Sequence, residues 1–158
     1  MRSKPTIVGV IGSSEPCGAG LCLAYEVGRL LAEAGVILVT GGLGGVMEAA
    51  SRGCSEAGGQ VLGILPGDNP DSANPYVDIA IPSGMGHARN VLVAQTAQAL
   101  IAIEGELGTL SEIAIGLKNG RAVFLLGSTL QVRGAVEVAT PQQAVSAALL
   151  ALKEGSDG

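Results

Sequence analysis

The chain has 158 residues and a formal net charge of −5, and 47% of its residues are hydrophobic, 15% are charged and 2% are aromatic. This length fits one domain that is large enough to bury a sizeable core. The nine Lys and Arg residues are scattered, without the basic stripe or aromatic platform that nucleic-acid binding uses. We therefore expect no nucleic-acid partner.

Cysteine, histidine and apolar content indicate a cytoplasmic protein without a metal site or a membrane partner. Cys17, Cys22 and Cys54 lack metal-site spacing, and the chain has one histidine, so we expect free thiols in a reducing compartment. The apolar residues from 91 to 103 are interrupted by polar ones and fall short of the ~20 that a spanning helix needs. Residues 1–5 lead directly into a strand-like run, which is not the pattern of a signal peptide.

The low share of charged residues also predicts self-association. A chain with 47% hydrophobic and 15% charged residues cannot cover its whole surface with charge. We expect a homodimer or a homotetramer, assembled through the helices that follow the glycine-rich turns at Gly41 and Gly84.

In the first half of the chain, buried strands alternate with helices. Residues 6–11 form a continuous β-branched run, which is typical of a strand buried on both faces. Apolar residues then recur at helical spacing until Gly35, a C-terminal cap. The patterns predict strands at 6–11, 36–40 and 60–65, and helices at 20–34 and 46–57.

The second half repeats the alternation after an irregular segment, Gly67–Pro75. The patterns predict strands at 76–81, 99–103, 122–126 and 136–138, and helices at 87–98 and 110–119. Thr140, Pro141 and Gln143 then open the last helix with an N-cap, a first-turn proline and a capping-box glutamine. We expect residues 1–5 and 154–158 to be frayed.

This order of elements predicts the fold class. Strands that are separated by helices run parallel with right-handed crossovers. We therefore expect a single α/β domain over residues 1–158, with a doubly wound, mostly parallel Rossmann-like sheet and helices on both faces.

Glycine-dense turns recur where predicted strands pass into predicted helices. They lie at 12–14, 41–45 and 105–109, and residues 83–86 have the same build. In a parallel sheet such turns share the carboxyl edge, where backbone N–H groups and helix N-termini bind anions. The turns therefore predict a phosphorylated or nucleotide-like ligand, although tight packing of the turn remains an alternative for Gly41–Gly45. The candidate ligand-binding residues are Gly12, Ser13, Ser14, Gly41, Gly42, Gly44, Gly45, Met85, His87, Arg89, Gly105, Gly108, Thr109 and Glu112.

The first turn does not have the spacing of a dinucleotide-binding protein. Gly9 and Gly12 do not form G-x-G-x-x-G, and the second strand ends in Thr40 rather than in an acidic residue. This pattern disfavours an NAD enzyme.

Arg89 is the most informative charged residue. It lies in the first turn of a predicted helix, where the helix dipole disfavours a cation, so its place indicates a nearby anion, either a ligand phosphate or a carboxylate. The alternative is an exposed arginine that points away from the helix end. His87 beside it either donates to the ligand or has a structural role.

Glu112 also allows two interpretations. Thr109 and Glu112 have the T-x-x-E spacing of a capping box, which explains both without a ligand. The same cap would hold Glu112 at the mouth of the crevice, where it could take part in chemistry.

Five segments follow one another in a fixed order: residues 41–49 (GGLGGVMEA), 57–59 (AGG), 63–66 (GILP), 84–90 (GMGHARN) and 105–112 (GELGTLSE). This set of motifs resembles the "lysine decarboxylase-like" Rossmann superfamily. Its members include the Lonely Guy cytokinin-activating phosphoribohydrolases and the molybdenum-cofactor carrier proteins. No lysine is placed to hold pyridoxal phosphate, so the decarboxylase name has no chemical support here.

The resemblance implies roles for two residues. In the phosphoribohydrolases, an arginine of M-x-x-R-K and the glutamate of P-G-G-x-G-T-x-x-E do the chemistry, and these roles fall on Arg89 and Glu112. The chain departs where Asn90 replaces the lysine, and where Glu104 and Glu106 replace the proline and second glycine. The added acids would repel a phosphate, which argues against a Lonely Guy substrate. The GMGHARN form of residues 84–90 is more similar to the carrier branch.

Two hypotheses follow from the resemblance. The first is a carrier or binding protein for a phosphorylated nucleotide or pterin-type ligand, with a bound nucleotide or the molybdenum cofactor as cargo and no cofactor required. The second is a phosphoribohydrolase that releases a free base from a nucleoside 5′-monophosphate through Arg89 and Glu112.

Overall fold

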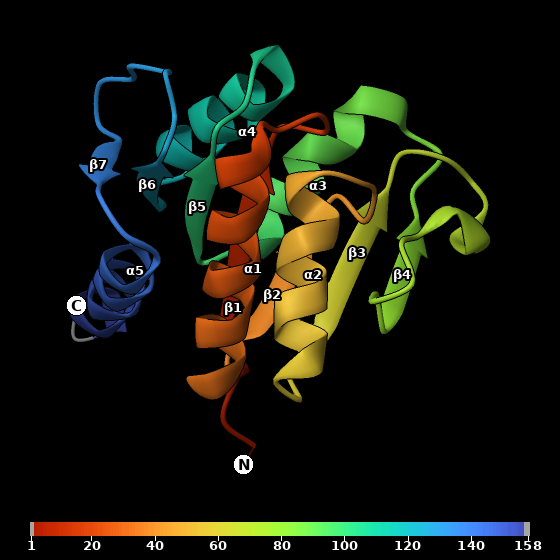
Figure 1. The fold of residues 1–158 in the computed structure, drawn as a ribbon, viewed down its shortest axis with the longest axis horizontal. Helices are drawn as coiled ribbons and strands as arrows, with labels where there is room; N and C mark the ends of the chain where they lie inside the picture. The colour runs from red at the N-terminus through yellow and green to blue at the C-terminus, as the bar shows by residue number, and fades with distance from the viewer. Residues whose placement is uncertain (1, 157–158) are drawn as a thin grey trace.

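The computed structural model describes residues 2–156, and within them every strand of the sheet runs parallel to its neighbours (Figure 1). The strands are β1 (Ile7–Gly12), β2 (Ile37–Thr40), β3 (Val61–Leu65), β4 (Ile79–Pro82), β5 (Ala99–Ile103), β6 (Ala122–Leu126) and β7 (Val136–Val138). The helices are α1 (Gly18–Glu33), α2 (Val46–Glu56), α3 (Arg89–Thr96), α4 (Leu107–Lys118) and α5 (Pro141–Ser156), and short 3₁₀ turns lie at Pro70–Ser72 and Gly86–Ala88.

The strand order is β4-β3-β2-β1-β5-β6-β7, and helices cover both faces of this sheet. On one face, α1, α2 and α5 pack against Val8, Val10 and Ile101, while α3 and α4 cover the other face around Leu100 and Val123. The strands β1, β2 and β5 are central, so both of their faces are buried, as the β-branched run of residues 6–11 predicts for β1. The structure confirms the predicted doubly wound α/β fold.

Small residues allow α1 and α2 to pack backbone to backbone. A Cβ atom at Gly28 would overlap the carbonyl of Ala50, and one at Gly53 would overlap the carbonyl of Tyr25. The glycines therefore bring the two helices together on the front of the sheet in Figure 1, and their N-terminal ends both lie at the carboxyl edge.

Most helix starts agree with the predictions, and α5 begins as expected. The Thr140 hydroxyl accepts a hydrogen bond from the Gln143 N–H at 3.1 Å, and the Gln143 side chain accepts one from the Ala139 N–H at 2.9 Å. This helix continues to Ser156, so the expected fraying of residues 154–156 does not occur, whereas residues 157 and 158 lie outside the described part.

The capping box predicted at Thr109 and Glu112 is wrong. Helix α4 begins three residues before the predicted start, with Glu106 at the N-cap and no side-chain cap. Gly105 has φ 108, and a Cβ there would meet the Thr109 side chain, so Thr109 packs inside the first turn. The predicted helix at 87–98 is likewise shorter, because residues 86–88 form a 3₁₀ turn before α3.

No helix within residues 2–156 has the length and apolar character that a membrane span requires.

Candidate functional site

A cleft of about 340 Å³ opens at the carboxyl edge of the sheet. It lies beside the topological switch point, where the chain leaves β1 for α1 on one face and leaves β5 for α4 on the other. Its volume is in the range of small-molecule sites. The lining residues are Gly12, Ser13, Ser14, Leu43, Met47, His87, Arg89, Asn90, Glu106, Leu107, Gly108, Thr109 and Glu112.

Arg89, the first residue of α3, is the only cation among the residues that line the cleft. It is 9% exposed; its Nη1 donates to the Asn90 side chain and its Nη2 to the Gly41 carbonyl at 3.4 Å. Its buried Nε has no hydrogen-bond partner. Burial lowers the pKa of the guanidinium, and the nearby Glu112 carboxylate opposes this effect.

Gly41 is part of this arrangement, although it does not line the cleft. A Cβ atom at Gly41 would lie 2.7 Å from Arg89 Nη2 and 2.7 Å from the Met47 sulfur. The glycine therefore makes room for the guanidinium at the end of β2, and the turn it belongs to positions the arginine.

Glu112, on the second turn of α4, is 6% exposed and lines the same cleft. Burial raises the pKa of its carboxyl to about 7, and the positive charge of Arg89 partly opposes this rise. Among the described residues, no ion pair joins the two side chains. Both groups belong to helices on the same face of the sheet.

The N-terminus of α4 forms one wall of the cleft. The first N–H groups of a helix have no partner within the helix, and they carry a partial positive charge. Here they belong to Leu107, Gly108 and Thr109, all of which line the cleft. Around Gly108 the space is open, since the nearest atom to a Cβ built there is Asn90 Nδ2 at 4.0 Å.

Asn90 links this helix end to α3. Its side-chain Nδ2 donates to the Ser111 hydroxyl at 3.3 Å, and that hydroxyl donates to the Gly108 carbonyl at 2.6 Å. Since Asn90 also holds Arg89, one short network orients the arginine and the first turn of α4 together.

The predicted site residues fall into two groups. Those that line the cleft are Gly12, Ser13, Ser14, His87, Arg89, Gly108, Thr109 and Glu112. Those that do not line it are Gly41, Gly42, Gly44, Gly45, Met85 and Gly105. The second group shapes turns, because Gly42, Gly45 and Gly105 have positive φ, while Met85 is exposed to solvent at 48%. His87 is exposed at the mouth of the cleft.

Sequence reasoning missed Leu43, Met47, Asn90, Glu106 and Leu107 as lining residues. The sequence feature that could have identified Asn90 as a lining residue was its position directly after Arg89. Leu107 is 82% exposed, and an exposed leucine in a glycine-rich turn marks a helix start only weakly.

The two acids expected to repel a phosphate differ in their positions. Glu106 is exposed and lines the cleft, whereas the Glu104 carboxylate points to the N-terminus of α1, where it accepts hydrogen bonds from Cys17. Of these two acids, only Glu106 therefore lines the cleft itself.

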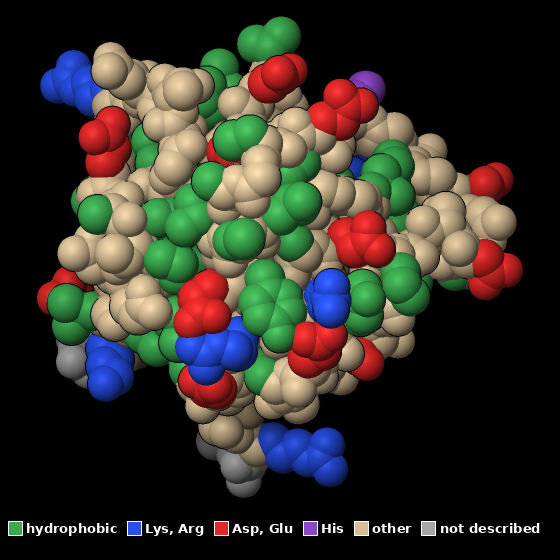
Figure 2. Space-filling model, in the orientation of Figure 1, with side chains coloured by type: hydrophobic (Ala, Val, Ile, Leu, Met, Phe, Trp, Pro, Cys, Tyr) green, Lys and Arg blue, Asp and Glu red, His purple; other side chains and the backbone are tan. Residues whose placement is uncertain are grey.

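A second hollow, of about 630 Å³, lies along the outer side of α1 and α2. Leu21, Cys22, Tyr25, Ala49 and Tyr76 are among its lining residues. In Figure 2 apolar side chains gather on this face, and charged ones gather below them. The charged group includes ion pairs of Arg29 with Glu26 and Glu33, and of Arg52 with Glu56.

Comparison with known proteins places this geometry in a family. The fold matches the molybdenum cofactor binding protein of Rippkaea orientalis with a TM-score of 0.90 and 34% identity, covering 96% of this chain and 99% of that one. It matches the molybdenum cofactor carrier protein of Chlamydomonas reinhardtii with a TM-score of 0.86 and 34% identity, covering 95% and 99%.

Two curated relatives are similar to the chain in sequence. An uncharacterized protein of Archaeoglobus fulgidus is 45% identical over 139 residues, which cover 88% of this chain and 91% of that one. The rice cytokinin riboside 5′-monophosphate phosphoribohydrolase LOG is 35% identical over 94 residues, which cover 57% of this chain but only 38% of the enzyme. The resemblance to the superfamily, nearer its carrier branch, is confirmed. Since the SLOG cluster4 family model matches residues 5–152, the chain belongs to the SLOG cluster4 family.

Proposed function

We propose that the protein binds a small ligand through a single phosphoryl group in this cleft, as a carrier or binding protein for a pterin- or nucleotide-type molecule. The observation that carries the proposal is the buried Arg89, whose Nε has no hydrogen-bond partner and which lines the cleft together with the first turn of α4. A phosphate oxygen would give the guanidinium a charge-assisted partner and would accept from the helix N–H groups.

The molybdenum cofactor is the first candidate cargo. Its pterin carries a phosphate, which fits the Arg89 wall, and proteins named for binding or carrying this cofactor share the fold at 34% identity. The chain has few aromatic residues to stack on a ring, so the ring would rest on aliphatic atoms such as those of Leu43 and Met47.

Ligand-dependent melting tests the proposal. Purified protein is heated with inorganic phosphate, AMP or molybdopterin, and with adenosine as the control that lacks a phosphate. We expect the melting temperature to rise with the phosphorylated compounds and to stay unchanged with adenosine. An equal effect of AMP and adenosine would contradict phosphate recognition.

Catalysis is the second candidate, and Glu112 favours it. A carboxyl whose pKa is about 7 can exchange a proton at neutral pH, as a general acid or base must. It would assist water at the ribose carbon of a nucleoside 5′-monophosphate, while Arg89 would hold the substrate. A relative named as a cytokinin riboside 5′-monophosphate phosphoribohydrolase, the rice protein, is 35% identical to the chain over 94 residues.

Glu112→Gln separates the two candidates. In a phosphoribohydrolase, release of adenine from AMP should be lost while AMP binding persists, because the amide keeps the shape of the carboxyl but not its basicity. In a carrier, no adenine is released by the wild type, and ligand binding by the variant stays nearly intact. Chromatography of free base, together with calorimetry of binding, measures both quantities. Base release by Glu112→Gln at the wild-type rate would contradict the catalytic role.

Gly108→Ala tests the helix end without disturbing the fold. The added methyl group would lie in open space at the cleft wall, so the folded protein should be as stable as the wild type or gain up to ~1 kcal/mol in helix propensity. Binding should weaken about tenfold or more, because the methyl group lies where a phosphate would approach. Gly155→Ala, also in open space but on α5, is the matched control and should leave binding unchanged.

Assembly is a further part of the proposal. Helices α2 and α3 lie on opposite faces of the sheet, so a contact through both would need two interfaces, as a homotetramer has. For a homodimer we place the contact on the α1–α2 face, where Leu21 is 43% exposed beside the apolar hollow. Light scattering at micromolar concentration should show an oligomer that Leu21→Glu dissociates and Leu150→Glu, on α5, does not. A monomeric wild type would contradict this part.

A further inference from the structure

Glu104 has a backbone conformation that side chains rarely adopt. It directly follows β5 and has φ 52, the only positive φ of a non-glycine residue in the part of the chain that the structure describes. Its side chain is directed across to α1, 87 residues away in sequence. The strained backbone is therefore coupled to a specific long-range contact.

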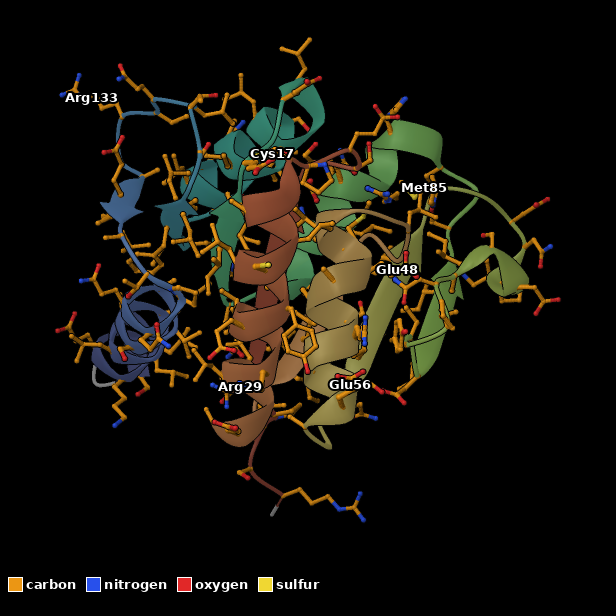
Figure 3. All side chains as sticks on the ribbon, in the orientation of Figure 1. Cys17, Arg29, Glu48, Glu56, Met85 and Arg133 are labelled. Atoms are coloured by element: carbon orange, nitrogen blue, oxygen red, sulfur yellow. The ribbon has the colours of Figure 1, made fainter. Side chains whose placement is uncertain are left out.

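That contact lies at the N-terminus of α1. Cys17, the N-cap residue, makes no side-chain cap of its own to the helix. Instead its backbone N–H donates to Glu104 Oε2 at 3.1 Å, and its thiol donates to Glu104 Oε1 at 2.8 Å. In Figure 3, Cys17 lies at the end of α1 that meets the carboxyl edge of the sheet. The side chain of Glu104, the residue after β5, thus fixes the N-cap residue of α1 and places a carboxylate at this helix end.

Helix α1 is shaped around this carboxylate. A Cβ atom at Gly20, in the first turn, would overlap Glu104 Oε1, and it would lie 3.0 Å from the Pro16 side chain. Gly20 is buried and is part of a regular helix, so the backbone there needs no glycine. The absence of a side chain is explained by the room that the Glu104 carboxylate needs.

The N-terminus of α1 is also the position where a phosphate binds in many parallel α/β proteins. The helix after the first, central strand offers free N–H groups and a partial positive charge to a phosphate or diphosphate. Here a fixed negative charge of the chain already lies there. At α4 the corresponding N-cap, Glu106, makes no side-chain cap, so that helix end remains open to the cleft.

We propose that Glu104 is a built-in anion that closes the α1 end of the crevice, so that the protein accepts ligands with one phosphoryl group and rejects diphosphate-linked ones. The closing of the α1 end concerns α1 alone, whereas the rejection of diphosphates rests on the proposed binding at Arg89 and α4. A diphosphate that extends from the Arg89 wall toward the N-terminus of α1 would bring its second phosphate closer to the Glu104 carboxylate, and like charges repel. Glu104 is then a specificity-determining residue.

Removal of the carboxylate should open a second anion site at α1. We choose Glu104→Gly, because glycine adopts φ 52 without strain and the variant is expected to fold, which circular dichroism checks. The substitution is made in an Arg89→Ala background, so that the main cleft does not contribute. Addition of inorganic pyrophosphate should raise the melting temperature of the double variant by several degrees, and that of Arg89→Ala alone by no more than added chloride of the same ionic strength.

Two further variants separate the effect of the negative charge of Glu104 from the effect of its side-chain volume. Glu104→Gln keeps the size of the side chain without its charge, and it should give a smaller pyrophosphate effect than Glu104→Gly. Glu15→Gln removes one negative charge from the exposed loop between β1 and α1 and leaves the contact of Glu104 with Cys17 in place. In the Arg89→Ala background it should give the same pyrophosphate response as Arg89→Ala alone. An equal pyrophosphate response of Arg89→Ala with and without Glu104→Gly would overturn the proposal.

The second part of the proposal, the rejection of diphosphate-linked ligands, is tested by a separate binding measurement. With Arg89 intact, the wild type should bind AMP more tightly than ADP, and Glu104→Gly should reduce this preference at least tenfold in calorimetry. A wild type that binds neither a nucleotide nor molybdopterin would count against the proposed function, while the pyrophosphate experiment would still decide the role of Glu104. A wild type that binds ADP as tightly as AMP would overturn the rejection of diphosphates.

Discussion

Arg89→Ala is expected to weaken binding of a phosphorylated ligand by about 2–3 kcal/mol, which is roughly 30- to 150-fold in Kd. The guanidinium is buried, its Nε has no hydrogen-bond partner, and its pKa is lowered by burial, so without a ligand it is held at some cost. A bound phosphate would give the guanidinium a charge-assisted partner. The melting temperature of the empty variant should therefore fall little or even rise, although binding is lost.

Arg121→Ala is the matched control for this prediction. Arg121 also has a buried Nε without a partner and donates through Nη2 to the Gln95 carbonyl at 3.2 Å, but it does not line the cleft. Titration calorimetry with AMP or molybdopterin should give wild-type affinity for Arg121→Ala. Equal losses in the two variants would show that the effect comes from the fold and not from a contact with the ligand.

Stability should depend on pH through Glu112. Its pKa of about 7 in the folded protein lies above the ordinary value of 4.5, so between these two pH values the folded state binds more protons than the unfolded state. The contribution to stability is therefore fully present below pH 4.5 and is lost as the pH rises to 7. The difference amounts to roughly 3 kcal/mol, on the order of 6–12 °C in melting temperature for a domain of this size.

Glu112→Gln should remove this part of the pH dependence. The amide cannot ionise, so the variant should gain stability over the wild type as the pH rises from 5 to 8. Glu106→Gln, an exposed acid in the same cleft, should leave the pH profile of the wild type unchanged. Thermal melts of the three proteins at pH 5, 6, 7 and 8 give the comparison, and parallel profiles for wild type and Glu112→Gln would contradict the raised pKa.

The fold was predictable because buried β-branched runs and glycine-ended helices are local signals. The strands β5, β6 and β7 have the predicted bounds, and the parallel order follows from the alternation of elements. The start of α4 was not predictable in the same way. Leu107 and Gly108 do not mark a helix start, and only the packing of Thr109 against Gly105 reveals it.

In the candidate site, the two buried charged residues were predictable from the sequence, and most of the contacts around them were not. Arg89 was identified because a cation at a helix start needs an anion, and Glu112 was identified from the resemblance and from its spacing to Thr109. The contact of Glu104 with Cys17 joins residues 87 positions apart, so no local pattern encodes it. The roles of Asn90 and Met47 likewise depend on how α2, α3 and α4 meet around the cleft.

A crystal structure with a bound phosphorylated ligand, AMP or molybdopterin, tests the central claim most directly. The account predicts the phosphate between the Arg89 guanidinium and the N–H groups of Gly108 and Thr109, within hydrogen-bond distance of both, and with no phosphate at the N-terminus of α1. A ligand whose phosphate lies in the hollow along α1 and α2, or beside Cys17, would contradict it.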